Sequence, residues 1–224
     1  FKAYRTWSDL KALPLIDGLR HVVEPYANYT FSPDPTVDAQ NLYQFDKVDT
    51  LGAVNSVKTG VRNKLQTKRN NATFELLNSD IYAVWNVDPE EDQDAFDYAG
   101  TKTTVHLNNH FKIEFIGKYA SNTVSETSTR LWFIYPKFKT SLEYQEKEST
   151  DSQLFTPTIN FIPNKRWTFE AYMRYEARDS RIEEHVYNIQ RNYDCIVWRL
   201  GFKHIPAYTR TDGYERDDDY RVEL

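Results

Sequence analysis

The sequence predicts an all-β fold of long antiparallel strands, and two observations support this. Residues 166–178 (RWTFEAYMRYEAR) alternate large apolar side chains with charged and polar ones. Successive side chains of a strand point to opposite faces, so this segment would form a strand with one apolar and one charged face. The same alternation recurs along the chain, and no segment shows a helical period of comparable clarity.

In the first half of the chain, the segment 1–7 already has the character of a strand, and residues 20–31 alternate apolar with polar side chains. Asn70-Asn71 and Asn108-Asn109 separate later segments, and asparagine tolerates the left-handed backbone that tight hairpin turns need. The sequence therefore predicts strands over 20–31, 53–68, 72–87, 101–107 and 110–120.

In the second half, the alternation continues through two long runs. In the first run Trp132, Phe138 and Leu142 share a parity, and in the second run Trp198 and Phe202 do. Because each run is continuous, we predict a single strand for each. The predicted strands of this half are 130–145, 152–162, 166–178, 184–204 and 220–224.

The predicted connections differ in length. Long polar connections cover 32–51, 88–100, 121–129 and 205–219. Tight connections lie near 70–71, 108–109, 146–151 and 179–180, while 163–165 is short where a long loop is due. Long loops on one side and short turns on the other are typical of a transmembrane barrel.

Strand length points in the same direction, because soluble strands most often hold about 5–6 residues. We therefore predict about ten strands of a larger antiparallel up-and-down transmembrane β-barrel. The alternative is a soluble β-sandwich or extended meander, whose strands also alternate.

Composition narrows the class of protein. The chain has 224 residues, 40% of them hydrophobic, and no run of about 20 apolar residues that would form a transmembrane helix. A mean hydropathy of -0.72 is compatible with barrel strands, which are only half apolar. The net charge of -5 combines both signs along the chain, which argues against a nucleic-acid partner.

A barrel assigns a role to each face. Large apolar side chains would face lipid, and charged ones a wet lumen. The residues predicted to face lipid are Trp132, Phe138, Trp167, Phe169, Met173, Trp198 and Phe202. The residues predicted to face the lumen are Arg62, Lys64, Lys112, Glu170, Arg174 and Arg199.

The sequence gives little support for a catalytic or metal site. His106 and His110 flank the predicted turn at 108–109, and no cysteine or carboxylate completes a ligand set. The acidic residues of 88–97 lack the spacing and glycine of an EF-hand. We expect no enzyme activity, no cofactor and no metal.

Several short motifs follow one another along the chain. The first is LRHVVEP at 19–25, followed by Tyr29 and Pro33, and then by the Phe45-Asp46 pair. The others are Asn55, Gly60, Asn63 and Leu65, and later Tyr187, Tyr193, Cys195 and Trp198. Their order resembles the family of the LPS-assembly protein LptD. In that family the cysteine usually directly precedes the tryptophan, whereas Ile196 and Val197 intervene here.

The resemblance implies that residues 1–224 are the C-terminal portion of an outer-membrane barrel, with a signal peptide and an N-terminal periplasmic domain outside this sequence. Such proteins insert lipopolysaccharide into the outer leaflet. The implied partners are lipopolysaccharide, outer-membrane lipids, an LptE-like plug lipoprotein and an LptA-like periplasmic bridge. Cys195 would either join a disulfide or remain a free thiol.

Two other functions stay open. A general porin-like channel would share the architecture. A soluble β-sheet binding module would share only the alternation.

Overall fold

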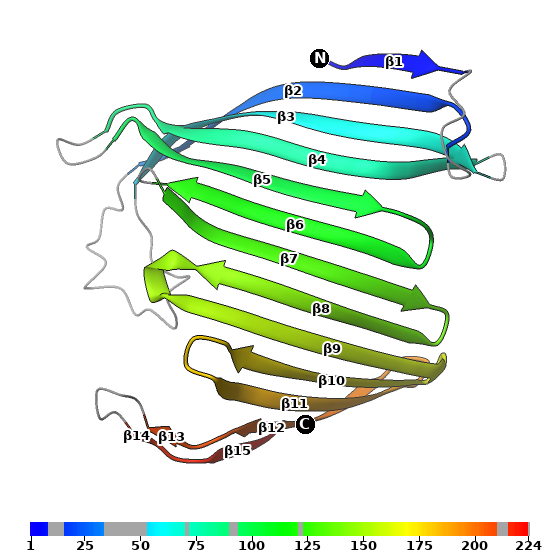
Figure 1. Cartoon of the computed structure of the whole chain (residues 1–224), viewed down its shortest axis with the longest axis vertical. Helices are drawn as coiled ribbons and strands as arrows, with labels where there is room; N and C mark the ends of the chain where they lie inside the picture. The colour runs from blue at the N-terminus through cyan, green and yellow to red at the C-terminus, as the bar shows by residue number, and fades with distance from the viewer. Residues whose placement is uncertain are drawn as a thin grey trace. The chain divides into compact units, whose positions relative to one another are not determined.

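The computed structural model describes residues 1–8, 16–33, 53–69, 72–89, 94–120, 123–209 and 215–223. Their regular structure is β apart from one short 3-10 turn, η3 (Glu148–Thr150). None of these residues belongs to a helix long and apolar enough to cross a membrane. Thirteen strands form one sheet in the order β1 to β12 followed by β15 (Figure 1).

The chain divides into two compact units. The first unit holds Phe1–Lys102 and Lys118–Thr123, and the second holds Thr103–Gly117 and Val124–Leu224. The strands that lie wholly in the first unit are β1 (Ala3–Trp7), β2 (Leu19–Ser32), β3 (Val54–Arg69) and β4 (Ala72–Asn86). The unit boundary passes through β5 (Phe96–His106), β6 (Phe111–Ala120) and the first residue of β7 (Thr123–Tyr135).

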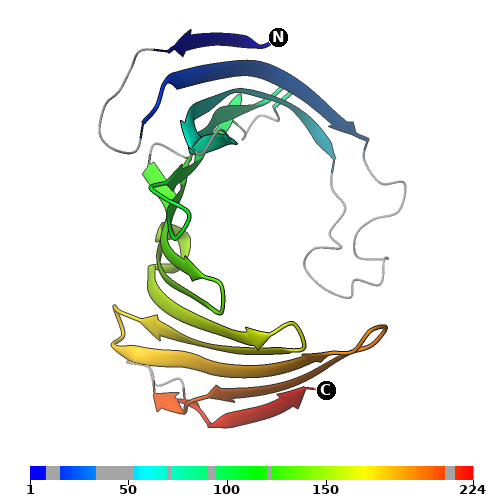
Figure 2. The same cartoon turned by 90° about the vertical axis from the view of Figure 1, so that its right-hand side faces the viewer.

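The remaining strands belong to the second unit. They are β8 (Phe138–Lys147), β9 (Ser152–Asn164), β10 (Trp167–Glu176), β11 (Arg181–Asn192), β12 (Val197–Ile205) and β15 (Asp219–Glu223). The short strands β13 (Tyr208–Thr209) and β14 (Glu215–Arg216) form a separate two-stranded sheet. Seen from the side, β10, β11 and β12 lie next to one another, with β15 beyond β12 (Figure 2).

Antiparallel pairing between chain neighbours builds each unit. In the first, β2 and β3 pair without interruption from Arg20 opposite Gln66 to Ser32 opposite Val54. In the second, β8 and β9 pair from Phe138 opposite Phe161 to Lys147 opposite Ser152. The all-β, antiparallel up-and-down prediction is confirmed, with thirteen strands in the sheet where about ten were expected. Within the described residues the sheet is not closed, because β1 and β15 are the two ends of its strand order.

Two predicted strands were wrong in extent. The run 130–145 is divided between β7 and β8, and Tyr135 pairs directly with Phe138 across the turn at Pro136 and Lys137. Proline has no backbone N–H for a ladder, so it suits a turn better than the middle of a strand. The run 184–204 is likewise divided, by a turn in which the Tyr193 N–H donates to the Ile196 carbonyl over 2.8 Å.

These turns correct the predicted connections. Residues 123–129 belong to β7, so the long loop expected over 121–129 is absent from that part of the chain. The additional turn after β7 shifts the alternation of the connections by one, and the additional turn after β11 shifts it back. The short turn at Lys165 and Arg166 therefore follows the pattern, where the expected pattern had made it an exception. The Asn164 side chain closes this turn by accepting the backbone N–H groups of Arg166 and Trp167.

The described residues do not enclose an apolar core. Their buried hydrophobic residues are Val22, Val84, Leu154 and Val186. The buried polar ones are Thr67, Ser79, Ser128, Ser141, Glu176 and Glu184. Polar side chains thus outnumber apolar ones among these buried residues, whereas apolar residues are the ones most often buried in globular proteins.

Candidate functional site

The second unit has one markedly apolar face. Residues directly opposite each other on neighbouring strands share a face. The register therefore joins Phe138, Phe161 and Phe169, and it also joins Tyr187 with Phe202. The large exposed residues of this apolar face, each 38% to 67% exposed, are Phe133, Tyr135, Phe138, Leu142, Phe155, Ile159, Phe161, Phe169, Tyr187, Trp198, Phe202, Tyr220 and Val222.

The exposed area of this face is larger than the apolar patch of a typical soluble monomer. At roughly 200 Å² for a large side chain, the exposed fractions add up to an area on the order of 1,000 Å². The largest apolar patch of a typical monomer is about 300–600 Å². The apolar face of the second unit therefore needs a covering of lipid or protein.

The opposite face of the second unit is charged. Near β6 and β7, Lys112 lies 3.1 Å from Glu114, and the indole N–H of Trp132 donates to Glu114 over 2.5 Å. Arg130 forms an ion pair with Glu143, which also accepts the Ser128 hydroxyl over 2.7 Å. These partners alternate in sign, so the face is polar without a single dominant charge.

A second charged cluster on this face surrounds Glu184. The Lys203 Nζ lies 2.5 Å from its carboxylate, and the Tyr172 hydroxyl donates to it over 3.2 Å. Arg174 reaches the same carboxylate at 3.6 Å. Glu184 is buried and has three partners, as a covered carboxylate requires.

The first unit also has one apolar and one charged face. Its apolar face exposes Tyr29, Phe31, Val61, Ile81 and Trp85, each between 36% and 63% exposed. The other face bears Arg62 between Glu24 on β2 and Asp80 on β4 in the strand register. Arg62 and Asp80 lie 3.9 Å apart.

Two tyrosine rings cover glycines on this charged face. A Cβ added to Gly60 would lie 2.6 Å from the Tyr26 ring, and one added to Gly100 would lie 2.5 Å from the Tyr82 ring. The Tyr26 hydroxyl donates to Asp80 over 2.9 Å. Glycine is required at both positions because the rings occupy the space of its missing side chain.

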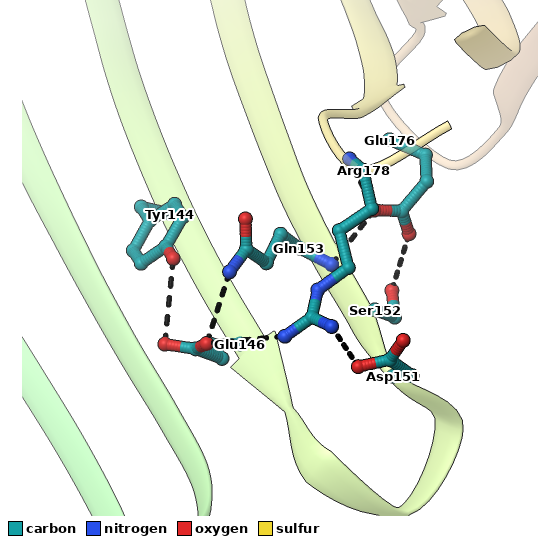
Figure 3. Close-up of polar contacts among 7 residues, drawn as sticks. All are labelled: Tyr144, Glu146, Asp151, Ser152, Gln153, Glu176 and Arg178. Atoms are coloured by element: carbon teal, nitrogen blue, oxygen red, sulfur yellow. Dashed lines mark hydrogen bonds and ion pairs between the residues drawn. The ribbon is translucent and has the colours of Figure 1, made fainter. Parts of the chain in front are cut away.

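A cluster of polar contacts borders the apolar face of the second unit at the connection between β8 and β9 (Figure 3). Glu146 accepts hydrogen bonds from Gln153 over 3.0 Å and from the Tyr144 hydroxyl over 3.4 Å. Arg178 forms ion pairs with Glu146 and Asp151, and so joins the connection after β8 to the one after β10.

Glu176 holds the same two connections together. Its carboxylate accepts the Ser152 hydroxyl over 2.5 Å, the Gln153 N–H over 2.7 Å and the Arg178 N–H over 3.3 Å. A cavity of about 510 Å³ lies beside this cluster, lined by residues that include Arg174, Glu176 and Arg181. Residues of both signs line it, so it does not select one charge.

A further contact lies outside the long strands, at the connection before β15. The Asp218 carboxylate accepts the Ala207 N–H over 2.8 Å and lies 3.1 Å from His204 Nε2. These two hydrogen bonds lower the pKa of Asp218 below its ordinary value. The β13–β14 hairpin is also held by Tyr208, whose ring lies under the guanidinium of Arg181 at 4.0 Å.

The register decides which predicted residues share a face. Phe138, Trp167, Phe169, Met173, Trp198 and Phe202 all lie on the apolar face of the second unit. Glu170, Arg174 and Arg199 lie on its opposite face, where the contacts of Lys112 with Glu114 place Lys112 too. Arg62 and Lys64 share the charged face of the first unit.

Trp132 is the exception. It was grouped with Phe138, but it pairs with Ser141 on the charged face, where Lys112 lies 4.9 Å from its ring. The turn at Pro136 and Lys137 reverses the parity between the two residues. The contact of Trp132 with Glu114 could not be expected from the sequence, because a single strand over 130–145 places Trp132 on the same face as Phe138.

Other residues singled out in the sequence lie in turns or contact neighbouring strands. His110 stacks on Tyr135 at 4.8 Å, and its Nδ1 lies 2.8 Å from the Ile134 carbonyl. Cys195 is a free, exposed thiol in the turn between β11 and β12. Asn63, from the motif in β3, lies 3.3 Å from His21. Phe45 and Asp46 lie outside the described residues, as do residues 90–93 of the acidic segment.

No family model matches the chain, and no curated protein matches it either.

Proposed function

We propose that this chain belongs to an outer-membrane translocon that inserts lipopolysaccharide into the outer leaflet. The observation that carries the membrane part of the proposal is the exposed apolar face opposite a charged one. Lipid would cover the apolar face, and the charged face would line a wet lumen. The protein would lie in the outer membrane and act in transport, without catalysis.

The strand lengths support this arrangement. A tilted strand needs about 9–11 residues to cross the hydrocarbon layer. β8 and β10 have 10 residues each, and β9 has 13. The outer edges of β1 and β15 would pair with further strands in a closed barrel, because unpaired backbone groups are costly in lipid.

The lipopolysaccharide part rests on the ordered motifs that resemble the LptD family. Charged side chains of both signs and tyrosines on the inner face would accept sugar and phosphate groups. An LptE-like plug and an LptA-like bridge are the partners that this function requires.

Depletion of the protein in its host tests the function directly. We expect a selective loss of lipopolysaccharide at the cell surface while other barrels still assemble. Normal surface lipopolysaccharide would contradict the translocon, and ion conductance by the purified protein would then favour a porin-like channel. Recovery of the protein in the aqueous phase without detergent would contradict the membrane assignment and favour a soluble binding module.

A further inference from the structure

Arg191 is a charged residue on the apolar face of the second unit. It lies directly opposite Trp167 of β10 and Trp198 of β12. The next residues on the same face of β11 are Ile189 and Tyr187. A cation among such neighbours needs a partner or a route to water.

Two aromatic rings flank the guanidinium of Arg191. Its Cζ lies 4.9 Å from the centre of the Trp167 ring and 4.7 Å from that of Tyr193. Its Nε is buried without a hydrogen-bond partner. Within the described part of the chain these rings are the only partners of the guanidinium, and no carboxylate pairs with it.

The site lies at one end of the strands. Trp167 is the first residue of β10 and Trp198 the second of β12. The turns beside them contribute Lys165 and Arg166, both exposed. The Asn192 N–H donates to the Arg166 carbonyl over 2.7 Å and so fixes the two turns together. In a membrane-inserted sheet, aromatic residues at a strand end lie at head-group depth.

We propose that Arg191, Trp167 and Tyr193 bind the phosphodiester head group of an anionic phospholipid. This inference rests on the proposed function, because it requires lipid on the apolar face. A guanidinium matches phosphate with two parallel hydrogen bonds, and stacking between rings fixes its plane in advance. Arg191 already fills the space between the rings, so the site does not suit a quaternary ammonium group.

The test uses the purified protein in lipid nanodiscs of mixed phosphatidylglycerol and phosphatidylcholine, and native mass spectrometry counts the lipids that stay bound. We expect the protein to retain phosphatidylglycerol in preference to phosphatidylcholine. Arg191→Gln should lower that preference about tenfold, since it removes charge-assisted hydrogen bonds. Arg191→Lys should keep part of it. Arg178→Gln, beyond the other end of β10, should leave it unchanged, because Arg178 is already paired with Glu146 and Asp151.

Equal retention of phosphatidylglycerol by the protein and Arg191→Gln would overturn the inference. Displacement of the bound phosphatidylglycerol by inorganic phosphate alone would also overturn the inference, because it would indicate a site for free phosphate. Insertion into the nanodisc is measured first on the same samples. A protein that inserts but shows no head-group preference contradicts this inference only, whereas one that does not insert contradicts the proposed function as well.

Discussion

Ile159 and Asn160 are neighbours in β9 whose side chains have opposite surroundings. Ile159 is 47% exposed on the apolar face, and Asn160 pairs with Lys139 and Glu170 on the charged one. We expect Ile159→Arg to cost about 2–4 kcal/mol of membrane stability near the midplane. Asn160→Arg, beside Glu170, should cost little. Urea unfolding of the protein folded into lipid vesicles measures both, and equal losses would contradict the assigned orientation.

The covering of Gly60 by Tyr26 gives a second test. Gly60→Ala puts a methyl group 2.6 Å from the ring, which must then move and release Asp80. We expect a loss of about 1–3 kcal/mol, typical of overpacking. Tyr26→Ala should also lower the free energy of unfolding. Combining it with Gly60→Ala should then lower that free energy little further. Additive losses in this double-mutant cycle would show that the ring and the glycine do not interact.

At the level of secondary structure, the turn between β7 and β8 determines on which face of the sheet Trp132 lies. We expect a cysteine at Trp132 to react with a water-soluble maleimide from the lumen side and one at Phe138 to be shielded by lipid. Cys195→Ser supplies a background without the chain's own thiol. Shielding of both positions would contradict the turn at Pro136 and Lys137.

The same hairpin shows what the sequence could and could not predict. Alternation located the strands because it repeats every two residues regardless of what the strands pack against. It could not locate the turn at Pro136, since apolar residues continue on both sides of it and even spacing preserves the apparent parity. At 193–196 the apolar side chains do change parity, from Tyr187 and Ile189 to Trp198 and Phe202, so the sequence does contain a signal for this turn. Contacts such as Trp132 with Glu114 depend on register between strands, which local sequence does not encode.

For the molecule as a whole, the exposed apolar face predicts how the protein behaves in solution. An area on the order of 1,000 Å² is about two to three times that of the largest apolar patch on a typical soluble monomer. We expect the protein to stay monodisperse in detergent and to aggregate when detergent is removed, as measured by light scattering. A monodisperse protein in plain buffer would show that another part of the chain covers this face.

The scarcity of buried apolar side chains in the described residues has a calorimetric consequence. Heat capacity rises on unfolding chiefly because apolar surface enters water, by about 12–15 cal/mol/K per residue in soluble domains. Here the apolar side chains already face outwards, and in detergent micelles they would stay in contact with hydrocarbon after the strands separate. We expect differential scanning calorimetry in micelles to give a heat-capacity increment per residue well below that of soluble proteins. The stability of such a protein would then vary with temperature along a flatter curve, with its cold-denaturation limit far from the physiological range.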